Sequence, residues 1–194
     1  MNPAEAWAEL LAGNQRFVEG RVDHPHQDAA RRADLAEGQA PIATIFGCSD
    51  SRLAAELIFD RGLGDLFVVR NAGQVISDSV IGSLEYAVSI LGVPLIVVLG
   101  HDACGAVAAA MQSTRPDATP FPVHIARIVR TILPAVHRVR ERNPSTPAYE
   151  LDPQEVGREH LRDTIRELLE ASPVTAEAVA DCRLAVVGAN YRLA

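Results

Sequence analysis

Four short apolar runs lie along the chain, separated by segments in which apolar residues recur every three or four positions. Short runs rich in Val, Ile and Leu are typical of buried strands, and the wider spacing is typical of amphipathic helices. The predicted strands are residues 42–47, 65–73, 94–100 and 183–193. The predicted helices are residues 3–18, 53–60, 77–92, 104–112, 123–142 and 154–172, with Pro134 expected to kink or break the fifth.

Strands that alternate with helices predict an α/β fold, in which a central, mostly parallel β-sheet is flanked by helices. With 194 residues the chain fits one domain, residues 1–194, whose first part, 1–40, is an N-terminal helical arm and a loop. On a monomer, Trp7, Leu11 and Phe17 of this arm would expose much apolar surface, so we expect the arm to pack on a dimer partner.

Charge and apolar content narrow the class of partner. The net charge is −7 and there is no basic tract, which argues against nucleic acid or an anionic membrane. The N-terminus lacks the pattern of a signal peptide, and no apolar run approaches the ~20 residues of a membrane span. We therefore expect a cytoplasmic protein that acts on a small molecule.

Three cysteines are too few for a disulfide framework, and an odd number cannot pair completely. In a reducing compartment they act as free thiols, metal ligands or nucleophiles. Cys182 lies just before the last predicted strand, and we interpret it as a buried structural thiol. The other two, Cys48 and Cys104, lie in polar turns flanked by glycine.

Those two cysteines belong to polar clusters that follow the first and third strands, "GCSDSR" and "GHDACG". Ligands of parallel sheets bind beyond the carboxyl ends of the strands, so both clusters are expected at one edge. Cys48, His101 and Cys104 then offer two thiolates and an imidazole, a ligand set that zinc accepts. Three protein ligands leave a fourth position for water, whose pKa zinc lowers toward ~7.

Plainer interpretations exist for the same residues. A buried structural cysteine beside a loop histidine would need no metal, although two clusters at one edge argue for a site. Asp50 can accept a hydrogen bond from a metal-bound water or bind the metal as a fourth ligand, and Arg52 can hold it in a bidentate ion pair. Alternatively, Asp50 and Arg52 form a surface ion pair of little consequence.

Other chemistries lack support in the sequence. There is no phosphate-binding loop, dinucleotide fingerprint or nucleophile elbow. The remaining histidines are interpreted as residues in solvent or on helix faces: His24, His26, His124, His137 and His160.

The pairing of "CSDSR" with "GHDACG" about fifty residues later resembles the β-class carbonic anhydrases. The resemblance extends to "GDLFVVRNAGQVI", "GSLEYAV" and "PLIVVLGH", more loosely to "RLAVVGANY", and covers roughly residues 5–191. It implies one Zn²⁺ per chain, bound by Cys48, His101 and Cys104, with Asp50 and Arg52 as a catalytic dyad beside it. When the dyad is paired the site is open, and when it separates Asp50 binds zinc and closes the site, with alkaline conditions favouring the open form.

The resemblance also implies substrate-binding residues. Gln39 matches a glutamine that hydrogen-bonds bicarbonate, and Gly105 matches a glycine whose N–H orients the bound anion. Phe67, Ala72 and Tyr86 match an apolar CO2 pocket that is built partly across a dimer interface. The family forms homodimers and dimers of dimers. Two positions depart from the family: Ile45 stands where some members have the tryptophan of an inhibitory bicarbonate pocket, and Ala106 where many have a second glycine.

The predicted function is the reversible hydration of carbon dioxide to bicarbonate and a proton through zinc-bound hydroxide. Two thiolate ligands should make the bound water less acidic than three imidazoles would, which favours activity at alkaline pH. One alternative is hydrolysis of a CO2 analogue, carbon disulfide or carbonyl sulfide, on the same scaffold. A second alternative is a zinc-containing bicarbonate sensor without turnover, but a sensor has no need of Asp50, Arg52 and Gln39. A third is a purely structural zinc protein, which would need a permanent fourth protein ligand.

Overall fold

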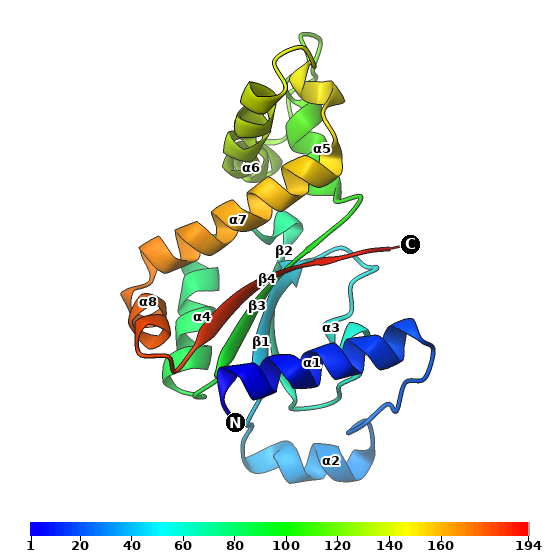
Figure 1. The fold of residues 1–194 in the computed structure, drawn as a ribbon, viewed down its shortest axis with the longest axis vertical. Helices are drawn as coiled ribbons and strands as arrows, with labels where there is room; N and C mark the ends of the chain where they lie inside the picture. The colour runs from blue at the N-terminus through cyan, green and yellow to red at the C-terminus, as the bar shows by residue number, and fades with distance from the viewer. Residues whose placement is uncertain (194) are drawn as a thin grey trace.

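The computed structural model describes residues 1–193 and has a parallel β-sheet at its centre (Figure 1). Within these residues the sheet has four strands in the order β2-β1-β3-β4, and every pairing is parallel. The strands are β1 (Ala43–Cys48), β2 (Leu66–Asn71), β3 (Leu95–His101) and β4 (Ala185–Tyr191). The predicted α/β fold with a flanked parallel sheet is therefore confirmed.

The register brings the two polar clusters to one edge. Cys48 pairs with Asn71 at the end of β1 and β2, and Gly47 pairs with Leu99 of β3. Cys48 and His101 are the last residues of adjacent parallel strands. The loops that follow them therefore leave the sheet at the same carboxyl edge. This confirms that the "GCSDSR" and "GHDACG" segments meet.

Alternate residues of the central strands supply two separate cores, because successive side chains of a strand point to opposite faces. Ile45, Val97 and Leu99 pack with residues of α1 (Pro3–Val18) and α3 (Ala55–Ile58) on one face. Phe46 and Val98 pack with residues of three helices on the other face. These are α4 (Asp78–Ser89), α7 (Pro153–Ala171) and α8 (Pro173–Ala180), which lie together on that side of the sheet in Figure 1. Both central strands are buried along their whole length, which explains why they are continuous apolar runs in the sequence.

The six predicted helices are all present, but two of them are shorter than predicted: helix 53–60 is one short turn, α3, and helix 77–92 is α4, Asp78–Ser89. Two further helices form where the prediction gave none: α2 in the loop of the N-terminal arm, and α8, which follows α7 directly. Ser172 ends α7 and also caps α8, where its side chain accepts a hydrogen bond from the Thr175 N–H. The helices are α1 (Pro3–Val18), α2 (Ala29–Asp34), α3 (Ala55–Ile58), α4 (Asp78–Ser89), α5 (Gly105–Gln112), α6 (Val123–Arg142), α7 (Pro153–Ala171) and α8 (Pro173–Ala180), with 3-10 turns η1 (Leu35–Glu37), η2 (Ala72–Gln74) and η3 (Ala148–Glu150).

Pro134 does not break α6, which is continuous from Val123 to Arg142. Proline removes one backbone hydrogen bond, but it lies on the exposed side of this helix. The opposite side buries Val129, Ile132 and Val136 completely or nearly so, and this packing outweighs the lost bond.

A third core cluster lies beyond the carboxyl edge of the sheet. It contains Cys48 and Cys104 together with apolar residues of α5 and α6, such as Val107 and Ile132. In Figure 1 these two helices stand together at the end of the molecule toward which the strands point. The two cysteines are thus enclosed between the sheet and a helical cap.

The N-terminal helix α1 packs on its own chain along its inner side, where Ala6 and Leu10 are fully buried. Asn2 and Glu5 form a reciprocal capping box at its start. Leu11 is exposed, as expected, whereas Trp7 and Phe17 are partly buried against the core of the same chain. Within residues 1–193, none of the helices combines the length and the apolar content that crossing a bilayer requires.

The environment of Cys182 differs from expectation: it is exposed rather than buried, because it lies in the turn between α8 and β4 with a left-handed φ of 57°. His160 lies on a helix face, one of its two expected environments. It is only 1% exposed, because this face of α7 packs on the turn after β2.

Candidate metal centre

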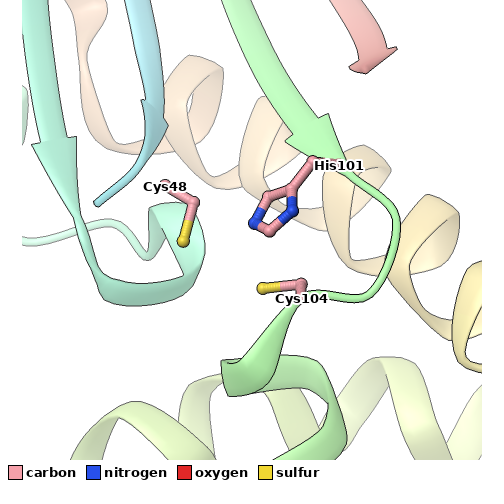
Figure 2. A group of neighbouring side chains, drawn as sticks. All are labelled: Cys48, His101 and Cys104. Atoms are coloured by element: carbon pink, nitrogen blue, oxygen red, sulfur yellow. The ribbon is translucent and has the colours of Figure 1, made fainter. Parts of the chain in front are cut away.

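Cys48, His101 and Cys104 converge beyond the carboxyl edge of the sheet, where Figure 2 shows both sulfur atoms and the imidazole directed into a common space. Their ligand atoms all lie within 4.8 Å of one another, and all three residues are buried. Cys48 ends β1, His101 ends β3, and Cys104 precedes the first residue of α5. Each of the three predicted ligands is therefore positioned by a different element: β1, β3 or α5.

The orientation of His101 identifies its free nitrogen. Nδ1 lies 2.8 Å from the Asp102 carbonyl oxygen, which can only accept, so Nδ1 carries the proton. Nε2 then presents a lone pair, and it is buried without a hydrogen-bond partner among residues 1–193. A buried acceptor with no partner is costly, and a cation bound at Nε2 would remove that cost.

The two thiols influence each other. The pKa of the Cys48 thiol is lowered, chiefly by a hydrogen bond from Cys104 and further by one from the Gly73 N–H. The pKa of Cys104 is raised, because the first thiolate disfavours a second one beside it and burial acts in the same direction. A divalent cation removes this repulsion and allows both sulfur atoms to lose their protons.

These residues fit zinc. Two thiolates and one imidazole form a ligand set known from catalytic zinc sites, in which the fourth position stays open to water or substrate. Among residues 1–193 the convergent group contains no fourth protein ligand, as a closed structural zinc site would require.

Asp50 and Arg52 lie in the turn after Cys48 and form a bidentate pair. Arg52 Nε donates to Asp50 Oδ1 over 2.8 Å, and Nη2 donates to Oδ2 over 2.7 Å. Arg52 Nη2 also reaches the Ala103 carbonyl oxygen in the other cluster, at 3.1 Å. The hydrogen bonds from Arg52 hold the pKa of the Asp50 carboxyl well below its usual range, so Asp50 is ionised at neutral pH.

Sequence reasoning missed Arg70, on β2, which holds this turn by two hydrogen bonds to its backbone. Its Nε donates to the Cys48 carbonyl oxygen over 2.9 Å, and its Nη2 donates to the Asp50 carbonyl oxygen over 2.7 Å. The signal available was a basic residue near the carboxyl end of a predicted strand, "VVRNAG". It was not enough, because the register that places Arg70 beside Gly47 is a tertiary fact.

The predicted substrate residues divide into two groups. Ala72 follows the end of β2 in the turn that contacts Cys48, and Gly105 begins α5 next to Cys104. Phe67 instead pairs with Thr44 near the amino end of β1, and the Tyr86 ring lies beside it at 6.1 Å between centroids. Gln39 is exposed and precedes β1, so it also lies toward the amino end of the strand that Cys48 terminates.

Residues 43–194 match the carbonic anhydrase family. Carbonic anhydrase 2 of Mycobacterium tuberculosis is 47% identical over 192 residues, which covers 99% of this chain and 89% of the relative. A carbonic anhydrase of Mycolicibacterium smegmatis is 45% identical over 193 residues and covers 100% and 90% of the two chains.

Solved structures agree with the sequence relatives. One of the tetrameric β-carbonic anhydrases of the ascomycete Sordaria macrospora superposes with a TM-score of 0.72 at 26% identity, covering 97% of this chain and 92% of that one. The fold, the Cys-His-Cys site and these relatives together show that the chain belongs to the β-class carbonic anhydrases.

Proposed function

We infer that this chain binds one zinc ion through Cys48, His101 and Cys104 and catalyses the reversible hydration of carbon dioxide to bicarbonate. The observation that carries this inference is the convergence of two thiols and an unpartnered Nε2 within 4.8 Å, on a chain of this family. When bound, zinc acidifies water so that it can attack CO2 near neutral pH.

We assign Asp50 the role of orienting the reacting water. An ionised carboxylate can only accept hydrogen bonds, and each oxygen has about two acceptor sites. Arg52 uses two of those on Oδ1, through its backbone N–H and Nε, and one on Oδ2. Oδ2 therefore keeps capacity for one more donor, and we propose that it accepts the hydrogen of the attacking water.

Arg52 sets the state of the site in this proposal. With both carboxylate oxygens bound to Arg52, Asp50 is unavailable as a ligand, which corresponds to the open form. Closure requires the two guanidinium hydrogen bonds from Arg52 to Asp50 to break. The same guanidinium group also donates to the Ala103 carbonyl oxygen, which holds Arg52 in the open arrangement. We keep the expected pH dependence, with the open form favoured under alkaline conditions.

Substrate enclosure is proposed to need a second copy of the chain. Phe67, Tyr86 and Gln39 lie toward the amino ends of the strands, and the zinc ligands lie at the carboxyl ends. Four residues of strand span about 13 Å, so Phe67 is too far from Cys48 to enclose a molecule as small as CO2 in the same chain. The exposure of Tyr86 supports a role toward a partner, and the Sordaria relative is described as tetrameric.

Ala72 and Gly105 are proposed to act in the chain that binds the zinc. Gly105 is the first residue of α5, whose N-terminal N–H groups carry partial positive charge and suit an anion such as bicarbonate. A cytoplasmic location is also kept as a proposal, and the exposed free thiol of Cys182 is compatible with a reducing compartment.

Stopped-flow CO2 hydration by zinc-loaded protein, at about pH 7 and about pH 8.5, tests the function. We expect fast turnover that is faster at the higher pH, and its loss together with the zinc in Cys104→Ser. If wild-type protein with one zinc per chain were inactive, the same preparation would be assayed with carbonyl sulfide and carbon disulfide. Turnover of either would support the analogue hydrolase, and failure of all three substrates would leave a bicarbonate sensor.

A further inference from the structure

His160 is a buried histidine on α7 that the zinc site does not use directly. Its Nε2 lies 2.7 Å from the Gly73 carbonyl oxygen, and it is 87 residues away in sequence. The carbonyl can only accept, so Nε2 carries a proton and donates it. Burial lowers the pKa of His160, which keeps the ring neutral with its single proton on Nε2.

Gly73, which accepts this bond, in turn contacts a zinc ligand. Its N–H donates to Cys48 Sγ over 3.3 Å. Gly73 and the next residue, Gln74, both have left-handed backbones, with φ of 74° and 41°. Consecutive residues in this region are unfavourable, and such a turn persists only where the surroundings hold it.

The surroundings of Gly73 hold it from two sides. A Cβ at Gly73 would lie 2.7 Å from the Ala106 Cβ of α5, so that helix leaves room for a glycine alone. From α7, His160 binds the Gly73 carbonyl, and the Thr164 hydroxyl lies 3.3 Å from the Gln74 carbonyl. The turn that donates to Cys48 is thus fixed from a helix that contributes no ligand.

We propose that His160 is a positioning residue for the zinc centre, which holds the Gly73 N–H on the Cys48 sulfur and thereby weakens electron donation from that thiolate. A thiolate that accepts a hydrogen bond gives less charge to its metal, and hydrogen bonds of this kind tune metal sites. The metal stays a stronger Lewis acid, so the reaction keeps more of its rate near neutral pH. This effect rests on zinc at the proposed ligands, but its first test needs no CO2 hydration.

A matched pair of variants separates the hydrogen bond from packing. His160→Gln and His160→Met have side chains of similar length and volume, but glutamine has an amide donor near the position of Nε2 and methionine has none. Both are loaded with Co²⁺, and the thiolate-to-cobalt charge-transfer band is recorded. We expect His160→Met to move this band to lower energy, because its thiolate donates more strongly, and His160→Gln to restore the wild-type position.

Two further readouts test the two parts of the proposal, the positioning of Cys48 and the strength of its donation. Without His160 the turn that holds Cys48 in place is less well supported, so His160→Met should lose its metal to a chelator about tenfold faster than wild type, the usual scale for losing an outer partner of a metal ligand. In zinc-loaded His160→Met the pH profile for CO2 hydration should move to higher pH. His160→Gln, which keeps a donor, should show neither the faster metal loss nor the shifted profile. Thr175→Val, at a fully buried position in α8 away from the site, is the control for a general loss of stability.

The proposal is overturned if His160→Met keeps the wild-type band and chelator rate, or if His160→Gln behaves like His160→Met. It is equally overturned if Thr175→Val reproduces the spectral change. Should His160→Met fail to fold, the ¹¹³Cd-substituted wild type decides by NMR. Scalar coupling between ¹¹³Cd and the Gly73 amide proton supports the bond to the Cys48 sulfur, and its absence refutes the proposal.

Discussion

At Asp50, a single guanidinium group determines both the charge and the direction of a carboxylate beside the zinc ligands. Asp50→Ala should keep its zinc, because the ligands come from other residues, and should lose about a hundredfold or more in CO2 hydration. Metal analysis and stopped-flow assays of the same preparation measure the two effects. Activity equal to wild type would show that the dyad has no catalytic role.

The lowered pKa of Asp50 also predicts how the charge of this residue depends on pH. Because the folded pKa lies below the ordinary value of about 3.9, Asp50 stays ionised throughout the neutral and mildly acidic range. Loss of activity between about pH 8 and pH 6 must therefore come from another titrating group or from separation of the dyad, and not from protonation of Asp50.

Gly73 gives a second prediction at this scale. Gly73→Ala places a Cβ against Ala106 in a left-handed backbone, so the turn should shift, the bond to Cys48 should weaken, and zinc should be lost faster. Gly92→Ala is the matched control, because Gly92 has a similar φ of 67° and open space around its Cβ. Chelator-driven zinc release should be accelerated in the first variant and unchanged in the second. Equal rates in both would exclude a role for the turn, and Ala106→Gly should partly rescue Gly73→Ala.

Among the elements, α1 is tied to the end of α3 by Asp60, whose side chain is 1% exposed. Its carboxylate accepts from Arg16 Nε at 2.6 Å and from the backbone N–H groups of Asp23 and His24. Burial alone would raise the pKa of Asp60, but these donors outweigh it and the net pKa is lowered. The carboxylate therefore stabilises the fold above its unfolded pKa of about 3.9, and this contribution is lost as the pH falls through the folded value.

Asp60→Asn should accordingly reduce the free energy of unfolding by about 2 kcal/mol at neutral pH, the scale of a lost charged hydrogen bond. The difference from wild type should shrink below about pH 4, where the wild-type carboxyl also begins to protonate. Urea unfolding of both proteins across this pH range measures the difference in the free energy of unfolding. Asp117→Asn is the control: its partner, Arg115, lies with it on the surface, so this variant should change the free energy of unfolding little. A pH-independent loss in Asp60→Asn would contradict the charge argument.

For the whole molecule, the division of predicted substrate residues between the two ends of the strands leads to a complementation experiment. Cys104→Ser lacks the zinc site and keeps Gln39, Phe67 and Tyr86, while Gln39→Ala combined with Tyr86→Ala has the opposite defect. If the pocket is completed by a partner, a one-to-one mixture of the two inactive proteins should regain up to about half the wild-type activity per zinc. After random exchange of subunits about half of the zinc lies in mixed dimers, and each mixed dimer has its one zinc in a complete site. Light scattering confirms that the mixture is oligomeric.

The mixing experiment also has an outcome that would contradict a pocket completed by a partner chain. If all the residues acted within one chain, no combination of the two variants would contain a complete site, and mixing would restore nothing. An active wild-type monomer would exclude the partner-completed pocket directly. The two variants must be unfolded and refolded together, so that subunits exchange.

The sequence by itself determined the strands β1 and β3 and the three ligands, because both depend on local information. A strand buried on both faces must be a continuous apolar run, and Cys48, His101 and Cys104 lie immediately where two such runs end. Tertiary structure decided what depends on contacts between distant segments. It turned His160 inward toward Gly73, left Cys182 exposed, kept α6 continuous through Pro134, and separated Phe67 and Tyr86 from the metal ligands of their own chain. The physical reason is that the identity of a residue fixes what its side chain can bind, whereas the packing of helices and the register of strands fix which groups come within reach.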